Sequence, residues 1–327
     1  MTKTSKSQKP SVTSSAPYSL VPMVFTFFLL YIFQGLFFGY IQTISLLLKE
    51  KNFTYAQMSL LNFVPVPFYL KCFFSPFLDI KYSSRLGKRM TYITIFSLLT
   101  AACYLFIAAH INSWIDHRQV STLSVVLIFT TFIIAIQDLA IDALAEEIFI
   151  RSHVKFGPIT QSLGQIAGPL ISFNFFLYIS QSVPDLNVKF LIVISFFTIC
   201  TTFLVFFYIK EKPTPSEFSS VLEIVKIFPH FLKNKNIRKY MIFLITSSIP
   251  IMFFRTNSSL ILLEKGISKQ DISLLSLPAL VSALICSTLS SKLTMTISST
   301  LRIMRLAYIA NIFIIGITFW VILHVLL

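Results

Sequence analysis

The sequence carries little charge: Asp, Glu, Lys and Arg make up only 12% of its 327 residues, about half the share typical of soluble domains. Hydrophobic residues account for 55%, and the mean hydropathy is +0.78. One water-soluble core could not bury so much apolar surface, whereas a surface that faces lipid explains it directly. We therefore exclude a soluble globular domain and predict an all-α polytopic membrane protein.

Signs of catalytic chemistry are also missing. The sequence has no glycine-rich phosphate loop and no nucleophile elbow, and its five histidines lack a catalytic or metal-ligating partner at a useful spacing. The four cysteines all lie in apolar segments, which argues against a disulfide framework or a metal site. An intramembrane acyltransferase has no positive support, so we expect neither an enzyme nor a bound cofactor.

Apolar segments of about 20 residues, the length that a helix needs to cross a bilayer, recur along the chain. A polar stretch over 210–239, interpreted as a cytoplasmic loop, divides a six-helix half (18–209) from an incomplete second half of three helices (240–327). Residues 1–17 are rich in Ser, Lys and Pro, which predicts a disordered cytoplasmic tail. The nine predicted spans are 21–47, 56–78, 90–110, 121–145, 157–180, 188–209, 239–263, 271–292 and 303–327.

The excess of 27 basic over 13 acidic residues, a net charge of +14, would indicate nucleic acid as the partner of a soluble protein. With the N-terminus in the cytoplasm, nineteen basic residues fall in inner segments, six in outer segments and two within spans. Inner loops of membrane proteins collect Lys and Arg in this way. The basic excess therefore reflects topology, and we expect a lipid bilayer and no nucleic acid as the partner; the sequence leaves protein partners open.

Four ionisable residues lie within predicted spans, where each costs at least about 2.5–3.5 kcal/mol unless it faces a cavity or a partner. Lys71 lies in the second span, Asp138 and Asp142 in the fourth, and Arg255 in the seventh. The four-residue spacing of the aspartates places both carboxylates on one helix face. Two interpretations stay open: a polar path through the bundle, or a buried structural ion pair between Lys71 and an aspartate.

Small residues and amide side chains mark the first and fifth spans. The glycines at four-residue spacing are Gly35, Gly39, Gly164 and Gly168, and the glutamines are Gln34, Gln161 and Gln165. Glycines spaced in this way let helices approach closely, and glutamines in spans often hydrogen-bond between helices. The pattern predicts tight helix packing at both spans.

Four blocks of the sequence, in the same order, resemble signatures of acetyl-coenzyme A transporters. The residues PFYLK and SPFLD within 67–79 resemble the second-helix signature, and QDLAID at 137–142 resembles that of the fourth helix. QSLGQIAG at 161–168 resembles the fifth-helix signature, and LEKGIS with LLSLP within 263–278 resembles the segment that leads into the eighth. Bacterial muropeptide permeases share several of these blocks and are the nearest alternative family.

The resemblance implies a carrier of the major facilitator superfamily, in which two six-helix halves rock around a central cavity. It implies acetyl-CoA as cargo, exchange against CoA as an antiporter, and the endoplasmic reticulum membrane as location. Asp79, Arg85 and Arg89 resemble the superfamily's inner loop between the second and third helices, which implies a gating role. Twelve helices are usual in the superfamily, so nine predict either a fragment or a shortened protein.

Candidate roles follow from charge within this expectation. Basic residues at membrane depth are suited to cargo phosphates, and amides to further cargo contacts. The candidate cargo-binding residues are Lys71, Arg255, Gln34, Gln161 and Gln165. We expect Asp138 and Asp142 to pair with Lys71 or other polar groups and to serve gating or ion coupling. Two other functions stay open: a proton-coupled permease for another solute, such as muropeptide-like amino-sugar peptides, and a truncated remnant that transports nothing.

Overall fold

The computed structural model describes residues 20–75, 78, 82–83, 85–152, 156–180, 182–211, 229 and 233–293, together with individual residues from 302 to 320. For some residues of the helices, Arg255 among them, it describes the backbone but not the side chain. Throughout this described part the secondary structure is helical and no strand is present. The predicted all-α class is confirmed to that extent.

Within the described residues, five helices are long and apolar enough to cross a membrane. They are α1 (Leu20–Glu50), α4 (Lys88–Asp116), α5 (Val120–Ser152), α6 (Phe156–Ile179) and α7 (Leu186–Tyr208). Their outward surfaces are apolar: Phe196, Phe203 and Phe207 of α7 are each more than half exposed. Such a surface suits lipid, and the chain is a multi-pass membrane protein.

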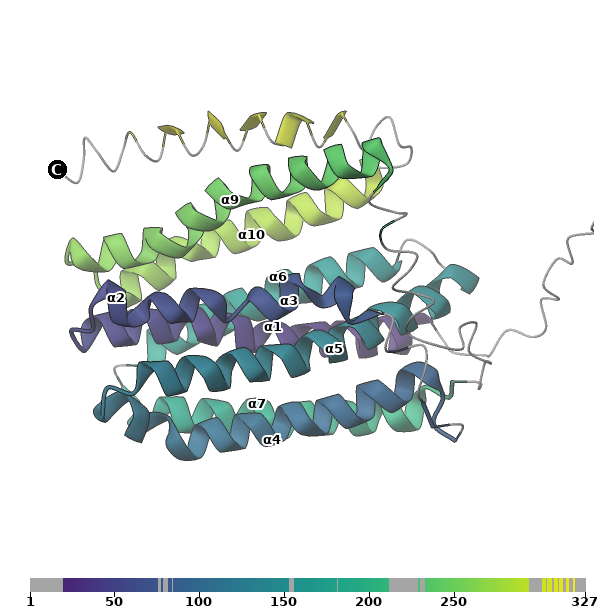
Figure 1. Ribbon diagram of the computed structural model, residues 1–327, viewed down its shortest axis with the longest axis horizontal. Helices are drawn as coiled ribbons and strands as arrows, with labels where there is room; N and C mark the ends of the chain where they lie inside the picture. Colours follow the sequence, from purple (N-terminus) through teal and green to yellow (C-terminus); the bar gives the residue numbers. More distant parts are fainter. Residues whose placement is uncertain are drawn as a thin grey trace, which may run out of the picture.

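Two further long helices, α9 (Lys235–Glu264) and α10 (Lys269–Leu293), lie together on one side of the bundle, and α4 with α7 lies on the other (Figure 1). Between them are α1, α5 and α6, with α10 packed against α6 and α9 touching α1. The total of nine spans and the division of the chain around 210–239 stay predictions.

The second predicted span, 56–78, is not one continuous helix, and this expectation was wrong. The chain instead forms four short helical pieces: α2 (Tyr55–Met58), η1 (Ser59–Phe63), α3 (Val66–Tyr69) and η2 (Lys71–Phe73). Pro65 and Pro67 are the physical reason, because proline has no amide hydrogen to donate and its ring clashes with the preceding turn. The backbone instead forms hydrogen bonds between residues three apart, such as that from the Phe74 amide to the Lys71 carbonyl at 2.9 Å.

Glycines set the distance between α1 and α6, the pair of helices on which the centre of the bundle is built. The backbones approach so closely that a β-carbon at Gly39 would lie 2.1 Å from the carbonyl oxygen of Pro169. A β-carbon at Gly168 would lie 2.5 Å from the carbonyl oxygen of Ile32, and one at Gly35 would lie 2.7 Å from the Pro169 ring. Small residues are therefore required along this contact.

Candidate functional site

A lysine and two aspartates meet inside the bundle, although they come from different elements. The Lys71 ammonium, on η2, donates to Oδ2 of Asp138 at 2.5 Å and to Oδ2 of Asp142 at 2.8 Å. Both aspartates lie on α5, one helical turn apart, so their carboxylates leave the helix on the same side. The break at Pro65 and Pro67 precedes Lys71 and sets where its turn lies against α5.

The other two carboxylate oxygens are held by neutral donors from α1 and α6. The Gln161 amide donates to Oδ1 of Asp142 at 2.7 Å, and the Tyr31 hydroxyl donates to the same atom at 3.0 Å. Oδ1 of Asp138 accepts from the Gln165 amide at 3.3 Å. We call these six residues, Tyr31, Lys71, Asp138, Asp142, Gln161 and Gln165, the acid–lysine cluster.

Tyr31 was missing from the sequence-based site. Its position carried a signal, because Tyr31 lies one turn before Gly35 and two turns before Gly39, on the same face of α1. A β-carbon at Gly164 would lie 2.5 Å from the Tyr31 β-carbon. The close approach of α1 and α6 therefore also brings the tyrosine hydroxyl into reach of α5.

Burial differs across the acid–lysine cluster. The Asp138 side chain is 0% exposed, whereas Lys71 and Asp142 are each 26% exposed at the side chain. Ion pairs that are largely removed from water have to be closely compensated, since desolvating each charge is expensive. Here one ammonium faces two carboxylates, so the fully ionised cluster carries one net negative charge.

Gln34 is the one predicted cargo contact on α1, and it is buried with 5% of its surface exposed. Neither its amide nitrogen nor its amide oxygen has a hydrogen-bond partner within the described structure. It lies three residues after Tyr31 and so points to a neighbouring part of the same helix surface. Leaving both atoms of a buried amide unpaired is costly, which makes Gln34 a candidate contact for a polar ligand.

The structure describes two of the three predicted gating residues that lie just before α4 or at its start. Asp79 lies outside the described residues, and Arg85 is described and exposed. Arg89 donates from Nε to Oε1 of Glu147 at 3.2 Å. Its backbone amide and that of Met90 donate to Oε2 of Glu211 at 2.8 and 2.9 Å. Arg89 thus links the start of α4 to the end of α5 and to the chain that follows α7.

Glu211 is a second residue that sequence reasoning missed. Its carboxylate accepts hydrogen bonds from two backbone amides in the first turn of α4, where amides have no partner within the helix. These amides favour a negative charge at this position. Gly87, with a φ of 95°, leaves room for it, since a β-carbon at that position would lie 2.6 Å from Glu211 Oε2. Burial raises the pKa of Glu211, and the two backbone hydrogen bonds oppose that rise.

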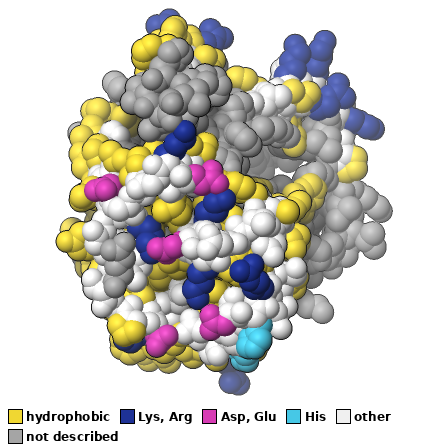
Figure 2. Space-filling model, turned by 90° about the vertical axis from the view of Figure 1, so that its left-hand side faces the viewer, with side chains coloured by type: hydrophobic (Ala, Val, Ile, Leu, Met, Phe, Trp, Pro, Cys, Tyr) yellow, Lys and Arg dark blue, Asp and Glu magenta, His cyan; other side chains and the backbone are white. Residues whose placement is uncertain are grey.

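At the opposite end of the bundle, acidic and basic side chains are interleaved (Figure 2). The last two residues of α1 pair with the two ends of the α9–α10 turn: Lys49 lies 2.6 Å from Glu264, and Glu50 lies 2.6 Å from Lys269. We call these the crossed ion pairs. Hydrogen bonds from Lys49 and Tyr55 lower the pKa of Glu264.

An apolar contact closes the bundle beneath the crossed ion pairs. Its buried side chains come from α1, α6, α9 and α10: Leu46, Phe173, Leu177, Leu260 and Ile272. Asn174 of α6 adds a polar link, since it accepts hydrogen bonds from Ser273 at 3.1 Å and from Ser276 at 2.5 Å. Helices α1 and α6 and the α9–α10 pair are therefore joined at this end, which the charge distribution predicts to face away from the cytoplasm.

The crossed ion pairs yield a testable prediction. Changing Lys49 to Glu places two negative charges together and should open this end of the bundle. The measurement uses a chain whose native cysteines are removed and in which a cysteine replaces Ser276. This cysteine should react severalfold faster with a membrane-impermeant maleimide when Lys49 is changed to Glu. The swapped double variant, Lys49→Glu with Glu264→Lys, should restore protection. Because the Glu264 pKa is lowered from 4.5, the native pair is complete above that value and weakens as the pH falls through the lowered pKa.

The matched control for this experiment is Lys51→Glu. Lys51 directly follows the last residue of α1 but pairs with Asp116 of α4 at 3.2 Å, so this contact does not involve α9 or α10. Its reversal should leave the labelling rate unchanged. Equal acceleration by both reversals would contradict a specific closing role for the crossed ion pairs.

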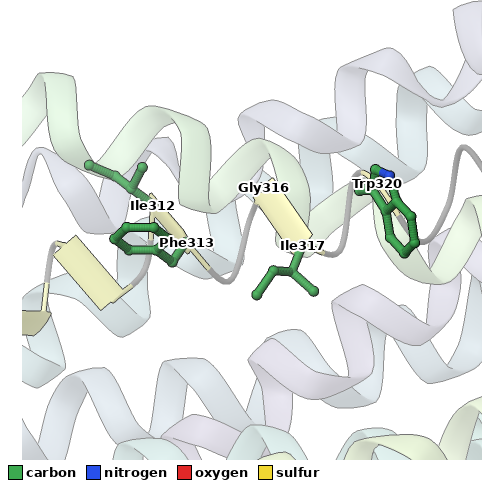
Figure 3. A pocket seen from close by; sticks show the side chains of 5 residues that line it. All are labelled: Ile312, Phe313, Gly316, Ile317 and Trp320. Carbon is green, nitrogen blue, oxygen red and sulfur yellow. The ribbon is translucent and has the colours of Figure 1, made fainter.

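Two other features carry no site. An apolar recess is lined by Ile312, Phe313, Gly316, Ile317 and Trp320 (Figure 3); this lining suits lipid or another helix and offers no group for a charged cargo. Among the described residues, no three His, Cys, Asp or Glu side chains are placed to hold a metal ion. The side chain of Arg255 lies outside the description, so its proximity to the acid–lysine cluster stays a prediction.

Comparison with known proteins locates the cluster within a family. The family described as "Acetyl-coenzyme A transporter 1" matches residues 23–196, more than half of the chain and all six residues of the acid–lysine cluster. An uncharacterized protein of Schizosaccharomyces pombe is 24% identical over 278 residues, 77% of this chain and 51% of that protein. An uncharacterized membrane protein of Saccharomyces cerevisiae is 25% identical over 182 residues, 50% of this chain and 32% of that protein. The chain thus spans about half the length or less of these relatives, and no solved structure matches it.

Proposed function

We propose that this chain, which belongs to the acetyl-coenzyme A transporter family, moves acetyl-CoA across an internal membrane in exchange for CoA. The family resemblance points to the endoplasmic reticulum, with the N-terminus in the cytoplasm. The observation that carries the proposal is the family match over 23–196, because that range contains the whole cluster of polar side chains at membrane depth. Such groups are expensive to keep in a bilayer and mark a transport pathway.

Acetyl-CoA brings phosphates, an adenine ring and a small acyl group to the carrier. Lys71 would contact a phosphate as a point charge, and Gln34, Gln161 and Gln165 would supply hydrogen bonds. Arg255 on α9 would add a second cation from the other half, in keeping with carriers whose sites lie between repeats near the midplane. Asp138 and Asp142 would govern when Lys71 is available.

The conformation supports alternating access as the mechanism. The crossed ion pairs and the apolar contact beneath them join the two parts of the bundle at one end. A carrier that alternates has to break these contacts to open that end and re-form them to close it. Arg89, with Glu147 and Glu211, would steady the helices at the opposite end.

The direct test is uptake of labelled acetyl-CoA by proteoliposomes that contain the full-length protein and CoA inside. We expect uptake that depends on internal CoA and that unlabelled acetyl-CoA inhibits, whereas free acetate does not. Vesicles without protein give the background. Purified protein that binds neither acetyl-CoA nor CoA and gives no uptake would contradict the proposal and favour a remnant that transports nothing.

Gln34 and Gln137 form a matched pair that separates cargo contact from folding. Gln34→Leu removes a buried amide that has no partner among the described residues, so membrane abundance should hold or rise while uptake falls severalfold. Gln137→Leu removes the amide that donates to Ser97 at 2.7 Å within the buried bundle, so abundance should fall. Abundance by quantitative blotting and uptake per carrier are the two measurements. Normal uptake in Gln34→Leu would remove Gln34 from the cargo site.

A further inference from the structure

The acid–lysine cluster raises a conflict for the proposed function. Lys71 is the cation assigned to a cargo phosphate, yet its ammonium already contacts both carboxylates. A phosphate that approached this cluster would meet one net negative charge instead of a free cation. Cargo and aspartates therefore compete for Lys71.

The contacts of the two carboxylates show what happens when Lys71 turns to a cargo. Within the described structure their partners come from α1, η2 and α6, and these are Tyr31, Gln161 and Gln165 besides Lys71. Lys71 is the only cation among them. Without it, two carboxylates would lie one turn apart with neutral donors alone, and Asp138 would be fully buried. Two like charges so placed repel, and burial adds to the penalty.

A proton is the cation that fits this position. Sodium would need several oxygen ligands around it, but the departure of Lys71 frees only the two Oδ2 atoms, because Oδ1 of Asp142 still accepts from Tyr31 and Gln161 and Oδ1 of Asp138 from Gln165. When Lys71 leaves, the Oδ2 atoms of Asp138 and Asp142 lose their donor and either can take a proton. Gln34 adds an independent indication of a polar ligand beside Tyr31, since its buried amide has no partner in the described part of the chain.

We infer that the acid–lysine cluster takes up one proton as the anionic cargo binds Lys71, so that cargo and proton bind together. In this step a proton from water forms an O–H bond on one carboxylate, the Lys71 ammonium keeps its charge, and its contact passes from carboxylate to phosphate. The inference rests on the proposed function for the identity of the cargo. The chemistry needs only an anion that reaches Lys71.

The experiment measures proton uptake with a pH indicator when CoA is added to the full-length protein in weakly buffered detergent solution. We expect about one proton per bound CoA and, where the carboxylates are ionised, a CoA Kd that rises about tenfold per pH unit. Asp138→Asn, which mimics the protonated acid, should bind CoA with at most half of that proton uptake and a flatter pH dependence. Asp116→Asn, at the exposed end of α4, is the matched control and should behave as the native chain.

The outcomes separate this inference from the proposed function. CoA binding without proton uptake would overturn the inference and leave the transporter proposal standing. Absence of CoA binding would contradict the transporter proposal, and an infrared measurement would then decide the inference without cargo. Lys71→Met imitates the state in which the lysine has turned to an anion, so its infrared spectrum should show the C=O band of a protonated carboxylic acid. The control is the triple variant Lys71→Met, Asp138→Asn, Asp142→Asn, in which this band should be absent. Identical spectra of the two variants would overturn the inference.

Discussion

Lys71→Met is expected to lower the amount of protein in the membrane strongly, because it leaves two carboxylates without their cation. Removing one partner of a buried ion pair destabilises a protein by about 3–5 kcal/mol, and here Asp138 is fully buried while both acids contact Lys71. The variant should recover as the pH falls, since protonation removes the uncompensated charge. Abundance in membranes and the thermal midpoint of the purified protein are the measurements.

Removing the charges together provides the decisive comparison. The triple variant Lys71→Met, Asp138→Asn, Asp142→Asn should regain most of the lost abundance, because ion pairs replaced as a unit are often neutral for stability, but it should not transport. Lys51→Met is the matched control, since its partner Asp116 is exposed and such surface pairs contribute about 0–1 kcal/mol. Full abundance of Lys71→Met that persists as the pH is raised, where a proton could no longer replace the lysine, would show that the aspartates do not depend on this lysine in the folded protein.

Much of the acid–lysine cluster could be predicted from the sequence because its members are conspicuous. An ionisable residue in an apolar span needs a partner, and the sequence offers few, so the two aspartates were expected to pair with Lys71 or with other polar groups. Tyr31 and Glu211 escaped because a tyrosine in a span and an acid in a loop are ordinary residues. Their roles depend on which helices pack together, which a single sequence does not specify.

The error at 56–78 has a similar cause. Mean hydropathy over 20 residues records how apolar a segment is but not whether its backbone can hydrogen-bond as one helix. Pro65 and Pro67 predict a break, yet prolines occur in transmembrane helices where neighbours satisfy the freed groups. The crossed ion pairs could not be predicted either, because Glu50 and Lys269 are 219 residues apart and only the folded chain brings them together.

Gly39→Ala is expected to destabilise the protein clearly although it adds only one methyl group. The new β-carbon would lie 2.1 Å from the Pro169 carbonyl oxygen, a backbone atom that moves only if α1 and α6 separate. Overpacking of this kind typically costs about 1–3 kcal/mol and occasionally more. Abundance and thermal midpoint should fall, and they should fall much less in the control Gly157→Ala, whose β-carbon would lie 3.3 Å from the Phe149 ring.

The larger consequence of Gly39→Ala is chemical. Gln161 and Gln165 reach the aspartates from α6, and Tyr31 reaches them from α1, so separating these helices withdraws donors from both carboxylates at once. Protein that still folds should therefore lose uptake beyond its loss of abundance, because Lys71 would be left as the main donor to two acids and held more firmly against them. Uptake per folded carrier equal to that of the native chain would show that close α1–α6 packing serves stability alone.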